Sequence, residues 1–133
     1  MKKLTIAALA LVMLTACGPK VTTGTAETAV DAEKVTVSVT LEDGKVSEIA
    51  IDETYNGSTK RTLGDEYGMA KYGGTDKEWY VQVDNLQNYI IENGVEAVVL
   101  DDSGYATGDL ASGCTINLYN IMSTVNDAIA NAK

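Results

Sequence analysis

Residues 34–51, with the sequence KVTVSVTLEDGKVSEIAI, decide the fold of this chain of 133 residues. Valine or leucine occupies every second position from 35 to 41 and polar residues lie between them, which is typical of a strand with one buried face. Asp43-Gly44 then provides a tight turn with the positive φ angles that such pairs adopt, and residues 46–51 return in the opposite direction. The sequence therefore predicts an antiparallel β-hairpin with strands at residues 34–41 and 46–51.

Two amphipathic helices are expected after the hairpin. The first follows a capping box at residues 75–78, TDKE, and ends at the pair Asn93-Gly94. Its apolar stripe consists of Trp79, Val83, Leu86 and Ile90. The second helix, at residues 116–132, closes the chain with an apolar face made of Leu118, Met122, Val125 and Ile129.

The remaining segments are less regular. Residues 52–75 are polar and punctuated by glycine, and long loops of this kind are usually functional or disordered. Residues 95–100, VEAVVL, are too short for periodicity to distinguish a strand from a helical turn. The whole pattern predicts an α+β fold: a small antiparallel sheet that opens with a β-hairpin and packs against helices, including a C-terminal helix.

The first residues have the organisation of an export signal. Lys2 and Lys3 precede an apolar run at residues 4–14, which is shorter than the roughly 20 residues that span a bilayer. The sequence LTAC at residues 14–17 resembles a lipobox, in which the cysteine receives a diacylglycerol. We therefore expect a lipoprotein signal peptide at residues 1–16 and a lipidated Cys17 that holds the protein in membrane lipid on the extracytoplasmic face of the cell membrane. The alternative is an ordinary signal peptide with a chance cysteine.

Residues 18–33, GPKVTTGTAETAVDAE, are expected to form a flexible tether. They include the chain's single proline and have no periodic apolar face. The alternative, a strand that packs on the domain, is disfavoured by the low hydrophobicity. The predicted organisation is thus a signal peptide at residues 1–16, the lipidated cysteine and tether at residues 17–33, and one domain at residues 34–133.

Composition excludes several classes of function. The net charge is −9 and becomes more negative without Lys2 and Lys3, so no nucleic acid is expected as a partner. The absence of histidine excludes histidine-based catalytic triads and metal sites, and neither a dinucleotide-binding fingerprint nor a Walker loop occurs. Residues 101–104, DDSG, lack the ligand spacing of a calcium loop, so we expect a solvated turn and no metal site there.

Residues 109–115, DLASGCT, stand immediately before the expected last helix. Taken alone, Ser, Gly and Thr at a helix start indicate capping. The run nevertheless resembles the attachment motif of the FMN-binding-domain family: Asp, two small or apolar residues, Ser or Thr, Gly, usually Ala, then Thr or Ser. This family includes the flavin-bearing G subunit of Rnf complexes, the C subunit of the sodium-translocating NADH:quinone reductase, and membrane-tethered lipoproteins of extracellular electron transfer. Cys114 is a departure, because the family usually has alanine there.

The resemblance extends over most of residues 34–133. Besides the motif, it includes the hairpin, residues 63–69 with Trp79 and Gln82 beyond them, and the closing helix. It implies that a flavin transferase joins FMN through its phosphate to the hydroxyl of Thr115. The other residues implied in cofactor binding are Asp109, Ser112, Gly113 and Cys114. Gly113 would allow a close backbone approach, and the phosphate would lie at the N-terminus of the helix expected at residues 116–132.

The ring of such a flavin needs apolar or aromatic walls, and the candidates are Tyr67, Met69, Tyr72 and Trp79. The bland alternative is that the tyrosines and the methionine cover the edge of the core. Lys60 and Arg61 either favour the reduced flavin or its phosphate, or they are ordinary solvated charges. Cys114 is either a reactive thiol beside the flavin or a buried, inert one.

The resemblance implies an electron carrier rather than an enzyme with its own substrate. It would relay electrons outside the cytoplasmic membrane from a membrane-bound donor, such as a quinone or NADH reductase, while the tether lets the domain swing. The first alternative is a cofactor-free ligand-binding or surface-interaction lipoprotein, in which residues 112–115 cap a helix. The second is a reductase that acts on a specific small molecule through the bound flavin.

Overall fold

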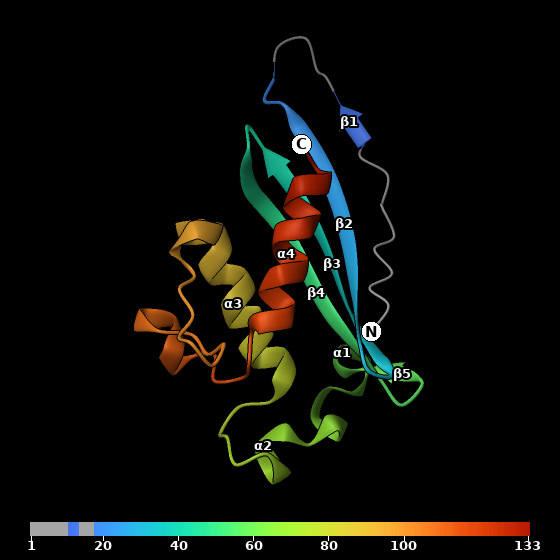
Figure 1. The fold of residues 1–133 in the computed structure, drawn as a ribbon, viewed down its shortest axis with the longest axis vertical. Helices are drawn as coiled ribbons and strands as arrows, with labels where there is room; N and C mark the ends of the chain where they lie inside the picture. The colour runs from blue at the N-terminus through green and yellow to red at the C-terminus, as the bar shows by residue number, and fades with distance from the viewer. Residues whose placement is uncertain (1–10, 14–17) are drawn as a thin grey trace.

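Five strands pair in chain order to form one antiparallel sheet. The computed structural model describes residues 11–13 and 18–133, and within them the strand order is β1-β2-β3-β4-β5. The strands are β1 (Leu11–Met13), β2 (Val21–Val30), β3 (Glu33–Glu42), β4 (Lys45–Tyr55) and β5 (Ser58–Thr59). Figure 1 shows β2, β3 and β4 as the three long strands that make the body of the sheet.

The predicted hairpin is confirmed as β3 and β4. Asp43 and Gly44 have φ angles of 51° and 81°, as a two-residue turn of this type requires. The predicted alternation of buried and polar positions holds along β3. Both strands run past the predicted limits, because backbone pairing continues where the alternation of side chains ends.

The predicted flexible tether is wrong, because residues 21–30 form β2. This strand pairs with β3 along its whole length, from Val21 opposite Glu42 to Val30 opposite Glu33. Its buried face consists of small residues, among them Ala26, which is 3% exposed. Low side-chain hydrophobicity was therefore a poor guide: the strand is held by backbone hydrogen bonds and by a close helix that only small side chains admit. The domain begins at or before β2, not at residue 34.

The segment just before β2 is also attached to the domain. The N–H of Asp43 donates to the carbonyl oxygen of Lys20 at 2.8 Å, and the N–H of Lys20 donates to Asp43 Oδ1 at 3.0 Å. The predicted lipidation at Cys17 and most of the predicted signal peptide lie outside the described residues. The part of that signal which is described, β1, pairs with the start of β2.

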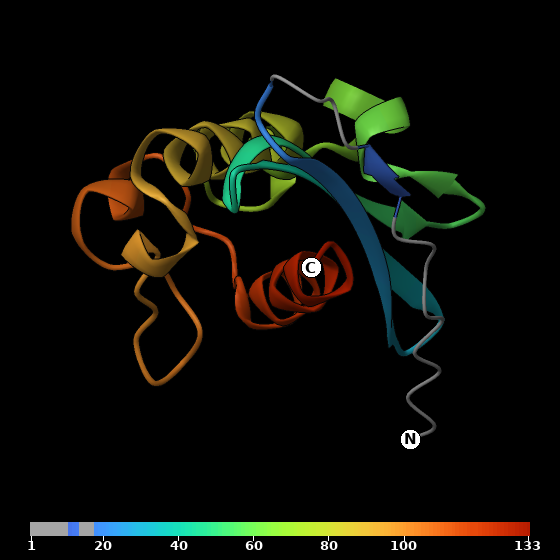
Figure 2. The ribbon, with the colours of Figure 1, turned by 90° about the horizontal axis from the view of Figure 1, so that it is seen from above.

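The helices lie on one face of the sheet. Helix α3 (Trp79–Asn93) packs on β4, and α4 (Tyr119–Asn131) packs on β2 and β3. Figure 2 shows α4 within the curve of the sheet, with α3 beside it. The shorter elements are α1 (Lys60–Leu63), α2 (Met69–Tyr72) and the 3-10 turns η1 (Gly64–Tyr67), η2 (Val95–Ala97) and η3 (Gly108–Ser112). The α+β prediction is therefore correct.

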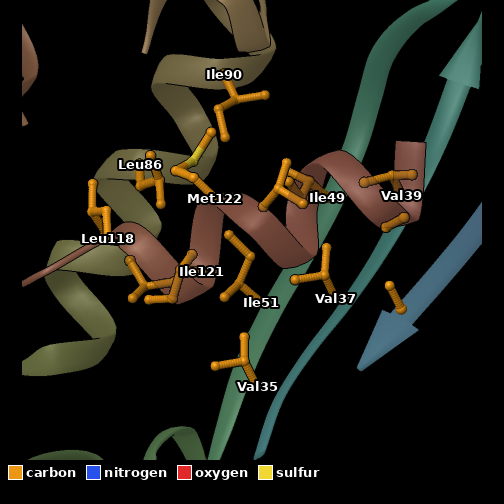
Figure 3. Packing of buried hydrophobic residues seen from close by; sticks show 14 of the residues in the cluster. Val35, Val37, Val39, Ile49, Ile51, Leu86, Ile90, Leu118, Ile121 and Met122 are labelled. Carbon is orange, nitrogen blue, oxygen red and sulfur yellow. The ribbon is translucent and has the colours of Figure 1, made fainter. Parts of the chain in front are cut away.

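The core lies between the sheet and these two helices. Buried side chains of β3 and β4 meet those of α3 and α4, as Figure 3 shows. They include Val35, Val37, Val39, Ile49, Ile51, Leu86, Ile90, Leu118, Ile121 and Met122. The predicted apolar stripe of α3 is buried throughout. The predicted face of the last helix is also buried, except for Ile129, which is half-buried.

The predicted capping box ahead of α3 does not form. Glu78 is the N-cap residue, and its carboxylate instead accepts from the backbone N–H groups of Met69 at 3.0 Å and Ala70 at 3.2 Å. The hydroxyl of Thr75 donates to the carbonyl oxygen of Lys77 at 2.8 Å. Glu78 therefore stabilises the start of α2, a neighbour in space that sequence spacing does not reveal.

Helix α4 begins at Tyr119, later than the predicted residue 116. The intervening residues are held by other contacts, including an isolated bridge between Tyr105 and Asn117 and a bond from Leu118 N–H to the carbonyl oxygen of Gly104 at 2.8 Å. Residues 52–75 contain the end of β4, β5 and three short helical turns. Residues 95–100 comprise η2 and a bridge from Leu100 to Ala106. Among the described residues, no helix has the length and apolar character to cross a membrane.

Candidate functional site

The motif predicted to carry the cofactor is a short loop that we call the motif loop, residues 109–115. Its apolar members face the core: Leu110 is 4% and Cys114 is 1% exposed. Asp109, Ser112 and Thr115 are exposed. The N–H groups of Gly113 and Cys114 both donate to the carbonyl oxygen of Leu110 at 3.0 Å, which closes η3. Two buried side chains thus fix the loop while its polar side chains face solvent.

Two amide side chains of α3 hold the end of the motif loop. Gln82 Oε1 accepts from the backbone N–H of Thr115 at 2.7 Å and from the Thr115 hydroxyl at 3.0 Å. One turn further, Asn85 Nδ2 donates to the carbonyl oxygen of Gly113 at 2.8 Å. A Cβ at Gly113 would lie 3.1 Å from Asn85 Nδ2, so the glycine permits this close approach. The predicted approach of the backbone to a phosphate stays a prediction, whereas the structure shows this glycine in close contact with α3.

Gln82 also connects the motif loop to α2. Its side chain is 1% exposed, and Nε2 lies 3.4 Å from Met69 Sδ and 3.1 Å from the carbonyl oxygen of Lys77. Met69, Gln82 and Thr115 are far apart in sequence and meet at this one amide. Of the predicted ring walls, Met69 is therefore the one that a chain of contacts connects to Thr115.

The other predicted walls differ in their surroundings. Trp79 is 1% exposed and belongs to the core, and its place in the wall of a cofactor site stays a prediction. Tyr67 is half-buried and packs edge to face against Tyr55, with ring centroids 5.0 Å apart. Tyr72 is 78% exposed on α2, and its ring lies over Gly68. Only Tyr72 has an aromatic face broadly open to solvent among these three.

Lys60 and Arg61 are engaged in structural contacts. Lys60 Nζ pairs with Glu53 at 3.0 Å and lies 4.9 Å from the centroid of the Tyr67 ring. The Arg61 guanidinium reaches the carbonyl oxygen of Ile51, Asp84 Oδ1 and Gln87 Oε1, at 2.6, 2.8 and 2.6 Å. Lys60 is thus held against β4 and Arg61 joins β4 to α3, so neither is an ordinary solvated charge, whereas a flavin contact stays a prediction.

Cys114 is a buried thiol. Desolvation raises its pKa to about 11 from the ordinary value of 9.0, and the backbone hydrogen bond at Ile116 opposes this only in part. The thiolate is the reactive form of cysteine, and almost none is present near neutral pH. Of the two alternatives, burial therefore favours the inert thiol.

The expectation for the phosphate needs correction. Thr115 does not open a helix, because α4 begins at Tyr119, and the backbone N–H of Thr115 is already bonded to Gln82. The N–H of Tyr119 is likewise bonded, to Asn117 Oδ1 at 3.0 Å. An anion on the Thr115 side chain would thus lie beside the loop rather than on a helix N-terminus.

The acidic turn at residues 101–104 is organised by the side chain of Asp101. Asp101 Oδ1 accepts from the N–H groups of Ser103 at 2.9 Å and Tyr105 at 3.0 Å, which folds the turn on itself. Among the described residues, no group of three or more Asp, Glu, His or Cys side chains is arranged to hold a metal ion.

Sequence reasoning included Gln82 in the resemblance but assigned it no role, and it missed Asn85. A signal was present: Gln82 lies three positions after Trp79, on the helix face that is otherwise apolar. A buried amide at such a position needs partners.

Comparison of the chain with protein-family models, with curated proteins and with solved structures finds no match.

Proposed function

We propose that this chain is a flavoprotein electron carrier with FMN joined through its phosphate to Thr115 Oγ1. The observation that supports it is a contact between three segments that share the resemblance. The buried amide of Gln82 in α3 contacts Thr115 of the motif loop and Met69 of α2. A threonine that merely capped a helix would bond to the first amides of that helix. The hydroxyl of Thr115 instead donates to Gln82 of α3, and Thr115 is exposed.

The residues present fit a phosphoester at Thr115. The attachment point must be a hydroxyl that a modifying enzyme can reach, and the backbone that carries it must be rigid. Thr115 is exposed, and Gln82 and Asn85 hold the backbone on both sides of the buried Cys114. When bound, FMN supplies one- and two-electron redox chemistry, and the protein provides position and surroundings.

We assign the apolar contact with the ring to α2. Met69 reaches the amide that holds Thr115, and Tyr72 on the same short helix presents an exposed aromatic surface. Flavin rings pack on flat, apolar groups, and a thioether beside an aromatic ring offers such a surface. This assignment replaces Trp79, whose ring is enclosed in the core.

The position of the site suits a carrier that is held in the membrane by Cys17. Helix α4 runs against β2, with Thr124 bonded to Thr28 and the backbone near Ala128 close to Gly24. The motif loop precedes α4, so it lies toward the end of β2 that is remote from Lys20. The 13 residues of α4 span about 20 Å at about 1.5 Å per residue. The flavin would therefore face away from the anchored end, toward a partner outside the membrane.

The test is covalent flavin transfer to the purified chain. The protein is incubated with a flavin transferase, flavin adenine dinucleotide and Mg²⁺, and the intact mass and visible absorption are recorded. We expect one FMN adduct on the wild type and on Thr115→Ser, which keeps a hydroxyl, and none on Thr115→Ala. Thr25→Ala, at an exposed threonine of β2, is the matched control and should carry the adduct.

An adduct that persists in Thr115→Ala would contradict the assignment of the site. A wild-type chain that gains no adduct, although a known substrate of the transferase does in the same tube, would contradict the function itself. That second outcome would favour a cofactor-free ligand-binding or surface-interaction lipoprotein.

A further inference from the structure

The orientation of the Gln82 amide is fixed by what surrounds it. Nε2 lies 3.1 Å from the carbonyl oxygen of Lys77 and 3.4 Å from Met69 Sδ. A carbonyl oxygen and a thioether sulfur can only accept hydrogen bonds, so the NH₂ end of the amide must face them. Oε1 therefore faces the motif loop, and with 1% exposure the side chain has no room in solvent to turn around.

This orientation locates the proton of the Thr115 hydroxyl. Gln82 Oε1 accepts only, so the hydroxyl, 3.0 Å away, must be the donor. The backbone N–H of Thr115 donates to the same oxygen at 2.7 Å. Two bonds to one atom fix the side chain relative to its own backbone. Because the proton points inward, the lone pairs of Oγ1 point away from Gln82.

We propose that Gln82 is a positioning residue for the covalent modification of Thr115. It holds the hydroxyl proton and the side-chain torsion so that the lone pairs of Oγ1 are presented to an incoming phosphorus atom. This inference rests on the proposed function, because it concerns how the same hydroxyl is prepared. A nucleophile held in one geometry avoids the entropy cost of finding it during the reaction.

The modification balances as a phosphoryl transfer. Oγ1 of Thr115 forms a bond to the FMN phosphorus of a flavin phosphoanhydride, here flavin adenine dinucleotide. The bond from that phosphorus to the bridging oxygen breaks, and adenosine monophosphate leaves with its electron pair. The hydroxyl proton leaves Oγ1 after the O–P bond has formed, when the Thr115 side chain turns away from Gln82, and passes to a base of the transferase. No atom changes its oxidation state.

The product no longer satisfies the contact with Gln82. An ester oxygen carries no proton, so Oγ1 and Oε1 at 3.0 Å would become two facing acceptors. The Thr115 side chain is expected to rotate away, while its backbone N–H keeps the bond to Oε1. Gln82 therefore prepares the hydroxyl and then releases the ester.

The experiment measures the initial rate of flavin transfer from flavin adenine dinucleotide to the full chain with a flavin transferase and Mg²⁺. Gln82→Leu removes the acceptor and should lower the transfer kcat/KM roughly tenfold. Gln82→Glu, with its buried carboxyl protonated, keeps an acceptor facing Thr115 and a donor facing the Lys77 carbonyl oxygen, and should recover most of the rate. Gln87→Leu is the matched control: it removes an α3 amide whose Oε1 accepts from Ile51 N–H and Arg61 Nη2, so it destabilises without touching the motif loop.

Amide hydrogen exchange at Thr115 and the thermal midpoint are recorded for each variant. We expect Gln87→Leu to lose stability and keep the wild-type rate, and Gln82→Leu to lose both the rate and the protection of the Thr115 amide. Equal slowing in both leucine variants, a wild-type rate in Gln82→Leu, or no recovery in a folded Gln82→Glu would overturn the inference and leave the proposed function intact. No adduct on the wild type would overturn both.

Discussion

Neighbouring side chains of the motif loop are divided between core and solvent, and this division assigns their chemistry. Cys114 is 1% exposed and points inward, whereas Thr115 next to it is exposed. The thiol of Cys114, the stronger nucleophile by type, is therefore buried, whereas the hydroxyl-bearing Thr115 is exposed. Gln82 completes the division, because its oxygen is bonded to Thr115 and not to the thiol.

Burial of Cys114 has a consequence for stability against pH. Its pKa is raised to about 11 in the folded chain, above the ordinary 9.0. The contribution of the protonated thiol to stability is therefore fully present below pH 9.0 and is lost as the pH rises toward about 11. We expect urea midpoints of wild type and Cys114→Ala to run parallel up to that window, and the wild type alone to fall further within it.

Thiol labelling supplies the control. At about pH 8 a native chain should show the same labelling as Cys114→Ala, and an extra label should appear on the wild type only in denaturant. Comparison of the two chains removes any contribution from Cys17. Rapid extra labelling of the folded wild type would show that the thiol is accessible.

At the scale of elements, β2 shows how a sequence of low hydrophobicity becomes part of a sheet. Polar residues such as Thr25 and Glu27 point away from the helices. They alternate with Gly24 and Ala26 on the inner face, over which α4 passes closely. A Cβ at Gly24 would overlap the carbonyl oxygen of Ala128 and lie 2.6 Å from the backbone nitrogen of Ala132. The small residues are thus a condition for helix packing and not a mark of a flexible segment.

Gly24→Ala is expected to destabilise the domain by about 1–3 kcal/mol, because the added methyl group must push α4 away from the sheet. Urea unfolding followed by the fluorescence of the single tryptophan, Trp79, measures the effect. Thr25→Ala, at the next and outward-facing position, should change the free energy of unfolding by less than about 0.5 kcal/mol. Equal stability of Gly24→Ala and wild type would return residues 18–33 to the role of a tether.

For the whole molecule, the domain extends back to Lys20, three residues after Cys17, the predicted lipidation site. Lys20 is bonded to the hairpin turn, so the described segment between Cys17 and the sheet is very short. The chain is acidic, with a net charge of −9, which suits association with a basic partner. If Cys17 is lipidated as proposed, the domain is held close to the membrane and the motif loop lies before the N-terminal end of α4, so we expect partners to approach the domain more than the domain swings toward them.

Removal of residues 18–33 tests this organisation. A chain that starts at residue 34 lacks β2, so β3 loses a neighbour along its whole length and α4 loses one of the two strands on which it packs. We expect residues 18–133 to unfold cooperatively in urea, and residues 34–133 to lose the cooperative transition together with the dispersion of their amide signals. A cooperative, equally stable shorter chain would restore the boundary predicted at residue 34.

Local features of the fold could be predicted from the sequence. Alternation at positions 35–41 and the pair Asp43-Gly44 were sufficient for the hairpin, and the stripe from Trp79 to Ile90 was sufficient for α3, because these signals depend on the period of one element. The α+β class followed from their combination. Burial of Cys114 was one of two alternatives, and the structure favours it.

Contacts between elements could not be predicted from the sequence and became visible only in the folded domain. Whether residues 21–30 formed a strand depended on a helix a hundred residues away, and whether Glu78 capped α3 or α2 depended on where α2 lay. The same holds for Gln82, which no local period connects to Thr115. Backbone pairing and buried hydrogen bonds depend on which groups meet in space, and that is settled when the whole core closes.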